Sequence, residues 1–458
     1  MMKYTDLLFL GAPLPEDVEK LKWHGDLAHA ARRIDKYLEG DLPQAQRSRL
    51  EAEKEVLRRL PEAYTLTWEE AVRRFDEVFE DASAGELEEL VENGAVDWIW
   101  CEGERRIIYN FAENLLKTRP AYSARAKGEY QDQVRDNQAN AERLDQVIHT
   151  MQEKGSSRWR FTLRESFTLK KDREDGPGIV RVHLPLPVEY AQVESFTLLR
   201  TSEEPAFIAP AAQPHRTIFF ERPMKAGETI EVEFSYAIRA DYVRPDPSKV
   251  LNEQPTFYTE EQLPHIALTP YIRAVAAEIT GGDKNPLIRA RRIYDYITSH
   301  LMYSFVRPYM AITDIPGYAA SGWKGDCGIQ ALLFVTLCRA ADIPARWQSG
   351  LYTTPVNVGC HDWAQFYVEP YGWLFADCSF GGSAWRVGST LRHDFYFGNL
   401  EPFRMPAASD FQQEFSPARK FPRNDPYDNQ VGEAEYADRP MEAGEFELKT
   451  ELLKAEEL

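Results

Sequence analysis

The spacing of apolar side chains divides the chain into stretches with different periods. Residues 1–153 carry them at helical spacing, as in LPEDVEKLKWHGDLAHAARRIDKYLEG and TWEEAVRRFDEVFE, and this spacing predicts a helical N-terminal region. Thr67 and Glu70, at the start of the second stretch, have the spacing of a capping box. No recognisable chemistry appears in this region. We interpret it as bulk structure in preference to a partner-binding or substrate-gating module.

Near Trp159 the spacing of apolar residues changes from helical spacing to every second residue. Runs such as WRFTLRESFTLK, IVRVHLPLP and ETIEVEFSYAIRADYV alternate polar and apolar residues, and the turn-forming segments GPG, SEEP, PAAQP and KAGE separate such runs. This pattern predicts an antiparallel β-sandwich of immunoglobulin-like type over residues 157–243, with about six or seven strands. The sandwich contains no cluster of ionisable residues, so we interpret it as a structural or adaptor domain.

Residues 255–406 contain stretches with helical spacing of apolar residues and stretches with strand-like alternation. Helical spacing in NPLIRARRIYDYITSHLMYS is followed by a buried helix in GDCGIQALLFVTLCRAADIPAR and by short strands in ARWQSGLYTT, HDWAQFYVEP and GWLFADCSF. The pattern predicts an α+β core. Residues 407–458 are rich in Pro, Asp and Glu and form an acidic C-terminal extension, whose final stretch GEFELKTELLKAEEL is predicted to be a short helix or disordered.

Composition narrows the possible functions. A length of 458 residues predicts about two or three domains, and a net charge of −19 disfavours nucleic acid and anionic membranes as partners. The five cysteines include no CxxC pair, which disfavours a disulfide scaffold and a structural zinc site. No stretch has the length of a membrane span or the pattern of a signal peptide. We expect a cytoplasmic protein without metal or cofactor.

Cys327 carries the clearest candidate chemistry. It begins the predicted buried helix, where free N–H groups and the positive end of the helix dipole favour a thiolate, and Asp326 is a candidate N-cap. His361, on a following strand, could accept the thiol proton and protonate a leaving group. Asp377, at the end of the next strand, could orient the imidazole. If His361 and Asp377 lie directly opposite each other, their side chains share one face, but the turn length leaves this register open.

The stretches around these residues resemble the transglutaminase-like superfamily, the papain-like core of tissue transglutaminases, peptide N-glycanases and many bacterial proteins. The matching motifs are a Gly-x-Cys turn that opens a helix, an Asp-Ile-Pro-Ala-Arg turn, His-x-Trp, and Gly-Trp leading to Asp, within roughly 285–400. The resemblance implies a papain-like core, with Cys327 as the nucleophile, His361 as the base and acid, and Asp377 as its orienting partner. The β-segment before the core resembles the sandwich that precedes it in many bacterial relatives.

The resemblance also implies acyl transfer on peptide or protein amides through a thioester. Hydrolysis is the favoured outcome, because bacterial relatives are more often hydrolytic and no calcium-site signature of the animal enzymes is apparent. Transfer to a lysine amine, as in a protein-glutamine transglutaminase, is an alternative. A non-catalytic multidomain interaction scaffold is another. The substrate and the oligomeric state stay open.

The second oxyanion donor does not follow from the resemblance. Papain relatives use a glutamine six residues before the cysteine, and Ser321 occupies that position here. Trp323 and Tyr303 are alternative donors, although a core aromatic is the preferred interpretation of Tyr303. Trp363 is a further candidate for the wall of the substrate site or for packing of the sheet.

Other residues near the motifs have weaker claims. His393 is close enough in sequence to compete with His361 as the base. Cys360 and Cys378 flank His361 and Asp377 at matching offsets. They could form a reversible disulfide or contribute with His361 to a metal site, but reduced thiols are the expected state in a cytosolic protein.

Overall fold

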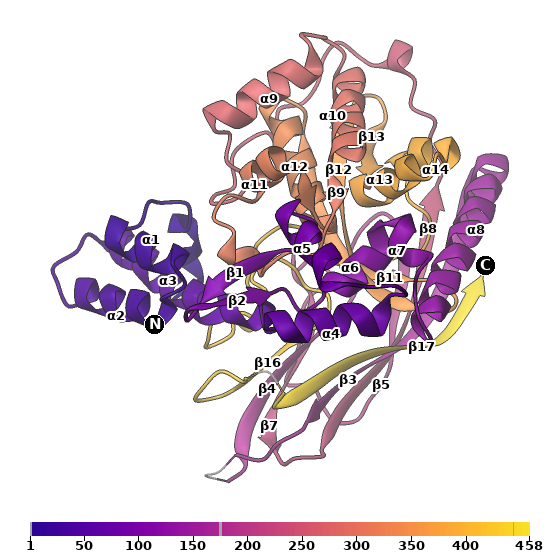
Figure 1. Cartoon of the computed structure of the whole chain (residues 1–458). Coiled ribbons are helices and arrows are strands. Elements are labelled where there is room, and N and C mark those ends of the chain that lie inside the picture. Colours follow the sequence, from indigo (N-terminus) through magenta and orange to yellow (C-terminus); the bar gives the residue numbers. More distant parts are fainter. Residues whose placement is uncertain (1, 174–175, 443) are drawn as a thin grey trace.

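The computed structural model describes residues 2–173, 176–442 and 444–458. A helical N-terminal region, a two-sheet sandwich and a mixed core of helices and sheet pack against one another (Figure 1), and one continuous apolar core extends through all three. A smaller apolar core joins the first three α-helices. The predicted α+β class, with antiparallel main sheets, is confirmed.

Helices form most of the N-terminal region. They are α1 (Glu16–Trp23), α2 (Leu27–Leu38), α3 (Gln44–Ala63), α4 (Trp68–Val78), α5 (Ala84–Glu92), α6 (Phe111–Thr118), α7 (Pro120–Ser123) and α8 (Tyr130–Lys154). The predicted capping box opens α4, because Thr67 Oγ1 accepts a hydrogen bond from Glu70 N and the Glu70 carboxylate accepts one from Thr67 N.

One stretch of this region departs from the predicted helix. Strands β1 (Trp98–Cys101) and β2 (Glu104–Ile107) form an antiparallel hairpin. Glu102 and Gly103 connect them with φ angles of 50° and 83°. Two consecutive residues at positive φ are the signature of a tight hairpin turn, and this local conformation overrides the helical spacing of the surrounding chain.

Two antiparallel sheets form the sandwich, with strand orders β17-β3-β8-β5 and β16-β4-β7-β6. Its first strands are β3 (Ser156–Leu169), β4 (Gly178–Pro185), β5 (Val193–Thr201), β6 (Phe207–Ile208), β7 (Thr217–Met224) and β8 (Thr229–Asp241). Burial alternates along β3, so that Phe161, Leu163 and Phe167 face the interior.

The C-terminal stretch completes both sheets. Strand β16 (Glu433–Tyr436) pairs with β4, and β17 (Phe446–Glu457) pairs antiparallel with β3 along most of its length. The predicted short helix or disordered segment at the end of the chain is therefore wrong. The Glu, Leu and Lys residues there are good helix formers, but pairing with the open edge of β3 satisfies backbone groups that a separate segment would leave to water.

The core sheet has the order β14-β13-β12-β11-β15, with antiparallel neighbours. Its strands are β11 (Ala345–Thr353), β12 (Val358–Val368), β13 (Gly372–Ala376), β14 (Phe397–Gly398) and β15 (Arg404–Ala408). The accompanying helices are α9 (Pro270–Thr280), α10 (Pro286–His300), α11 (Ile315–Gly322), α12 (Cys327–Ala340), α13 (Cys378–Arg386) and α14 (Thr390–Phe395). Helix α12 is almost wholly buried and packs on β11 and β12. Within the described ranges, no helix combines the length and the apolar character needed to cross a membrane.

Candidate active site

Cys327 is the first residue of α12, where the sequence places it. Asp326 is the N-cap: its Oδ1 accepts a hydrogen bond from Ile329 N at 3.2 Å, and the Tyr309 hydroxyl donates to the same oxygen. The helix ends at Ala340, as the following Asp-Ile-Pro turn predicts. The local sequence therefore holds the thiol at the N-terminal end of a buried helix.

His361 and Asp377 meet in the interior. His361 lies on β12, and its Nε2 is 2.8 Å from Asp377 Oδ2. Arg404 Nη1, from β15, donates to the same carboxylate oxygen at 2.8 Å. All three side chains are buried. The pair fixes the orientation of the imidazole and leaves Nδ1 as the ring nitrogen available to other groups.

The direct cross-strand pairing considered for His361 and Asp377 is wrong. Strands β12 and β13 pair Ala364 with Ala376, and β13 ends before Asp377. Asp377 instead caps α13, because its Oδ1 accepts a hydrogen bond from Phe380 N at 2.9 Å. The capping turn, rather than strand pairing, directs the other carboxylate oxygen towards His361.

The thiol contacts a carboxylate that the sequence reasoning missed. Cys327 Sγ donates to Asp362 Oδ2 at 3.2 Å, and Asp362 Oδ1 accepts from Gln430 Nε2 at 2.9 Å. Between the two described residues Cys327 and His361 there is no hydrogen bond. Asp362 is the variable position of the His-x-Trp motif, and Gln430 belongs to the predicted acidic extension. For Asp362, only its position beside His361 could have suggested a role, and no sequence signal marks Gln430.

The surroundings of Cys327 oppose the effect expected from its helix position. Burial raises the pKa of the thiol well above its ordinary value, the Asp362 and Asp326 carboxylates raise it further, and the Lys117 ammonium acts in the opposite direction. Burial also raises the pKa of Asp326 to about 6, and it raises the pKa of Asp362. The expected thiolate is therefore disfavoured, and the resting thiol needs a base.

The histidine is suited to accept that proton. Burial lowers the pKa of His361, although the Asp377 carboxylate acts against this effect. Burial acts to raise the pKa of Asp377, but the His361 imidazole and the Arg404 guanidinium hold it below its usual range. The site therefore combines a neutral imidazole with an ionised carboxylate at neutral pH.

The family comparison matches this part of the chain. Residues 273–378 fit the model of the transglutaminase-like superfamily, and the matched span includes Cys327, His361 and Asp377. The chain carries a transglutaminase-like core. The span extends from α9 to the first residue of α13, and so the resemblance recognised in the sequence is confirmed for the core. No curated protein matches the chain.

Solved structures show a distant likeness. A candidate cysteine protease from Cytophaga hutchinsonii has 11% identity and a TM-score of 0.40, with 66% of this chain and 90% of that one covered. The periplasmic domain of TgpA from Pseudomonas aeruginosa has 14% identity and a TM-score of 0.27, with 48% and 90% covered. A candidate protease from Parabacteroides distasonis has 12% identity and a TM-score of 0.20, with 50% and 60% covered. At such low sequence identity, structural similarity determines neither the activity nor the substrate of this chain.

The three aromatic candidates within the transglutaminase-like core lie at different distances from the thiol and the imidazole. The Tyr303 side chain lies within hydrogen-bonding reach of Cys327 and accepts a hydrogen bond from Lys117 Nζ at 3.0 Å. Trp363 is buried next to the imidazole of His361, with ring centroids 6.3 Å apart. Trp323 is 52% exposed and packs edge-on against His300. Tyr303 is therefore the candidate oxyanion donor that lies at the thiol.

The other residues considered from the sequence, which are a serine, a histidine and two cysteines, have surroundings that give them no part in the hydrogen bonds that Cys327, His361 and Asp377 form among the described residues. Ser321 is exposed and donates a hydrogen bond to the backbone of its own helix. His393 Nε2 lies 3.0 Å from Thr298 Oγ1 on α10. Cys360 and Cys378 are both free thiols. Among the described residues, no group of three or more His, Cys, Asp or Glu side chains is placed to hold a metal ion.

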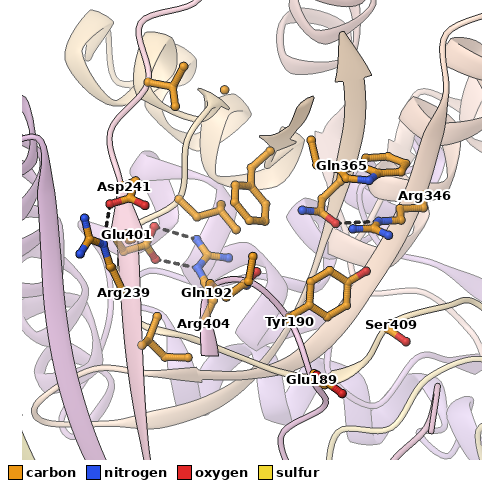
Figure 2. A pocket seen from close by; sticks show the side chains of 18 of the residues that line it. Glu189, Tyr190, Gln192, Arg239, Asp241, Arg346, Gln365, Glu401, Arg404 and Ser409 are labelled. Carbon is orange, nitrogen blue, oxygen red and sulfur yellow. Dashed lines mark hydrogen bonds and ion pairs between the residues drawn. The ribbon is translucent and has the colours of Figure 1, made fainter. Parts of the chain in front are cut away.

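The Arg404 side chain also lines a cavity of about 670 Å³ between the sandwich and the core sheet, and so it lies between this cavity and the site. Figure 2 shows the Glu401 carboxylate next to the Arg404 guanidinium, with Nε–Oε1 at 2.7 Å, and the hydrogen bond from Arg346 to Gln365 on another wall. Because Arg404 donates to both Glu401 and Asp377, its guanidinium is held between two carboxylates. This network locks the group that orients His361.

Proposed function

We propose that the protein is a cysteine-dependent hydrolase of peptide or protein amides that acts through a thioester on Cys327. The observation that carries the proposal is the buried His361–Asp377 pair, which lies one residue along β12 from the carboxylate that holds the thiol. An activated thiol, a neutral imidazole and an orienting carboxylate are the parts that nucleophilic catalysis by cysteine requires.

In the proposed reaction, His361 Nδ1 takes the proton from Cys327 as sulfur attacks the amide carbonyl carbon. The carbon–nitrogen bond breaks when His361 gives this proton to the leaving amine, while Asp377 stabilises the imidazolium. Water then adds to the thioester, with His361 as the base again, and releases the acid and the free thiol. A primary amine in place of water would give the transamidated product.

Stabilisation of the oxyanion is proposed to involve Tyr303 and the first turn of α12. Tyr303 accepts a hydrogen bond from Lys117, so its own hydroxyl proton stays available to a substrate oxygen. The N–H groups of the first turn have no partner within the helix and point towards its N-terminal end. Both kinds of donor act most strongly where water is excluded.

Mass spectrometry of a peptide library tests this proposal. The wild-type protein is expected to shorten peptides or deamidate their side chains, and an added primary amine separates hydrolysis from transfer. Cys327→Ala should abolish every product, whereas Cys360→Ala, which removes an exposed thiol, should retain activity. Equal product formation by wild type and Cys327→Ala, or no product from any peptide, would contradict the proposal and favour the scaffold alternative.

A further inference from the structure

A smaller pocket of about 190 Å³ opens beside His361, between the N-terminal region and the core. Helices α6 and α8 provide one side of it, and α13 and α14 provide the other. The pocket is smaller than the roughly 300 Å³ at which drug-sized ligand sites begin. It therefore suits a single short polar group rather than a whole molecule.

The charges that line this pocket are of one sign. Lys117, Arg386 and Arg392 contribute to its wall beside the neutral imidazole of His361, and no Asp or Glu is found among the described residues that line it. Arg392 is 3.0 Å from the carboxylate of Asp145. The pocket is cationic although the chain has a net charge of −19, so its charge is opposite in sign to that of the whole protein. A cationic cleft of this kind concentrates anions.

Two of the cations form no ion pair with a described carboxylate. Lys117 Nζ donates to Tyr303 and lies 4.1 Å from the centroid of that ring. Burial lowers the pKa of its ammonium group, although the Asp326 and Asp377 carboxylates act against this effect. Within the described ranges, neither Lys117 nor Arg386 forms an ion pair, and Arg386 makes no side-chain hydrogen bond. Partly desolvated cations without an anionic partner are costly, and an anion supplied by a ligand would reduce this cost.

We propose that this pocket binds a carboxylate of the substrate next to the amide that Cys327 attacks, with Lys117 and Arg386 as its donors. The inference rests on the proposed function and names a substrate class for it. The carboxylate can belong to an acidic side chain or to a free chain terminus, because both present the same two oxygens. The N-terminal region then takes part in substrate recognition, since it supplies Lys117.

Paired peptides test the substrate preference. The best substrate from the library is compared with versions carrying Glu or Gln on each side of the cleaved bond, and with a free or an amidated C-terminus. The wild type should prefer one carboxylate-bearing version by roughly 10–100-fold in kcat/KM, the range expected for charge-assisted hydrogen bonds. Arg386→Gln and Lys117→Gln should each reduce this preference, whereas Arg32→Gln, an exposed residue on α2, should retain it. Equal kcat/KM for all versions would overturn the inference and leave the proposed function standing.

Alkylation of Cys327 gives a second readout that does not need turnover. Anionic iodoacetate and neutral iodoacetamide are compared, and the modified peptide is quantified by mass spectrometry. Relative to free cysteine, the wild type should favour iodoacetate by roughly tenfold because the pocket attracts its carboxylate. Arg386→Gln should lose this preference. If no peptide is cleaved but the preference is present, the pocket stands and the proposed reaction fails; a ratio equal to that of free cysteine would refute the pocket.

Discussion

Replacing Asp362 with asparagine tests which group controls the reactivity of the thiol. The substitution keeps the size of the side chain and an oxygen able to accept the hydrogen bond from Cys327, but it removes the negative charge. Since the Asp362 carboxylate raises the pKa of Cys327, Asp362→Asn should lower that pKa. We therefore expect the variant to contain more thiolate at pH 7 than the wild type.

The size of the effect follows from the geometry. At the 3.2 Å between Cys327 Sγ and Asp362 Oδ2, two unit charges repel by about 5 kcal/mol at an effective dielectric constant of about 20. Burial favours the protonated form of Asp362, so only part of this repulsion is realised, and we expect about 1.4–2.7 kcal/mol, or 10–100-fold more thiolate. A less basic thiolate is a weaker nucleophile, which offsets about half of this gain on a logarithmic scale. The alkylation rate constant should rise by roughly 3–10-fold.

The assay measures iodoacetamide alkylation of Cys327 between pH 5 and 10, with the modified peptide identified by mass spectrometry. Asp35→Asn removes a surface carboxylate on α2 and serves as the control for net charge. A slower reaction of Asp362→Asn at pH 7 would refute the reasoning, because it would mean that Asp362 acts as the base for the thiol. In that case the proposed role of His361 in the first proton transfer would also fail.

Two further variants test buried charges. Arg404→Gln leaves Asp377 and Glu401 without their buried cation, so chemical denaturation should show a loss of about 3–5 kcal/mol in the free energy of unfolding. Arg164→Gln, at a partly exposed ion pair on β3, should change this free energy much less, and similar losses would contradict this reasoning. Burial lowers the pKa of His265 to about 3, so below pH 6.5 the unfolded chain binds a proton that the folded protein does not, and acidification to pH 5 costs about 2 kcal/mol of stability. His265→Leu should lose less stability than the wild type between pH 7 and 5, and an equal loss in both proteins would exclude this contribution.

The position of Cys327 and the contact between His361 and Asp377 were predictable because their determinants are local. The capping residue Asp326 and the turn at Pro344 define α12 from within one stretch of sequence. A short hairpin then separates the histidine from the aspartate. The exact register was not predictable, because the N-cap conformation of Asp377, rather than strand pairing, determines where its carboxylate points.

The other contacts at the site depend on residues far apart in the chain. Lys117 reaches Tyr303 across 186 positions, and Gln430 reaches Asp362 across 68. Neither the spacing of apolar residues nor a sequence motif identifies such partners. Single Lys and Gln residues are also usually exposed to solvent. The edge pairing of β17 was missed for the same reason, since its composition favours a helix and only the open edge of β3 selects the strand.

These long-range contacts come from elements outside the matched transglutaminase-like span. The matched span 273–378 contains the thiol, the imidazole and its carboxylate, but not the cation at Tyr303 or the amide that holds Asp362. Lys117 arrives from the N-terminal region, and Gln430 is held in the segment between β15 and β16. Because β16 and β17 complete the two sheets of the sandwich, the position of Gln430 depends on the sandwich being formed. The electrostatic environment of Cys327 thus depends on residues outside the matched core as well as on the core itself, because Lys117 and Gln430 come from other parts of the chain.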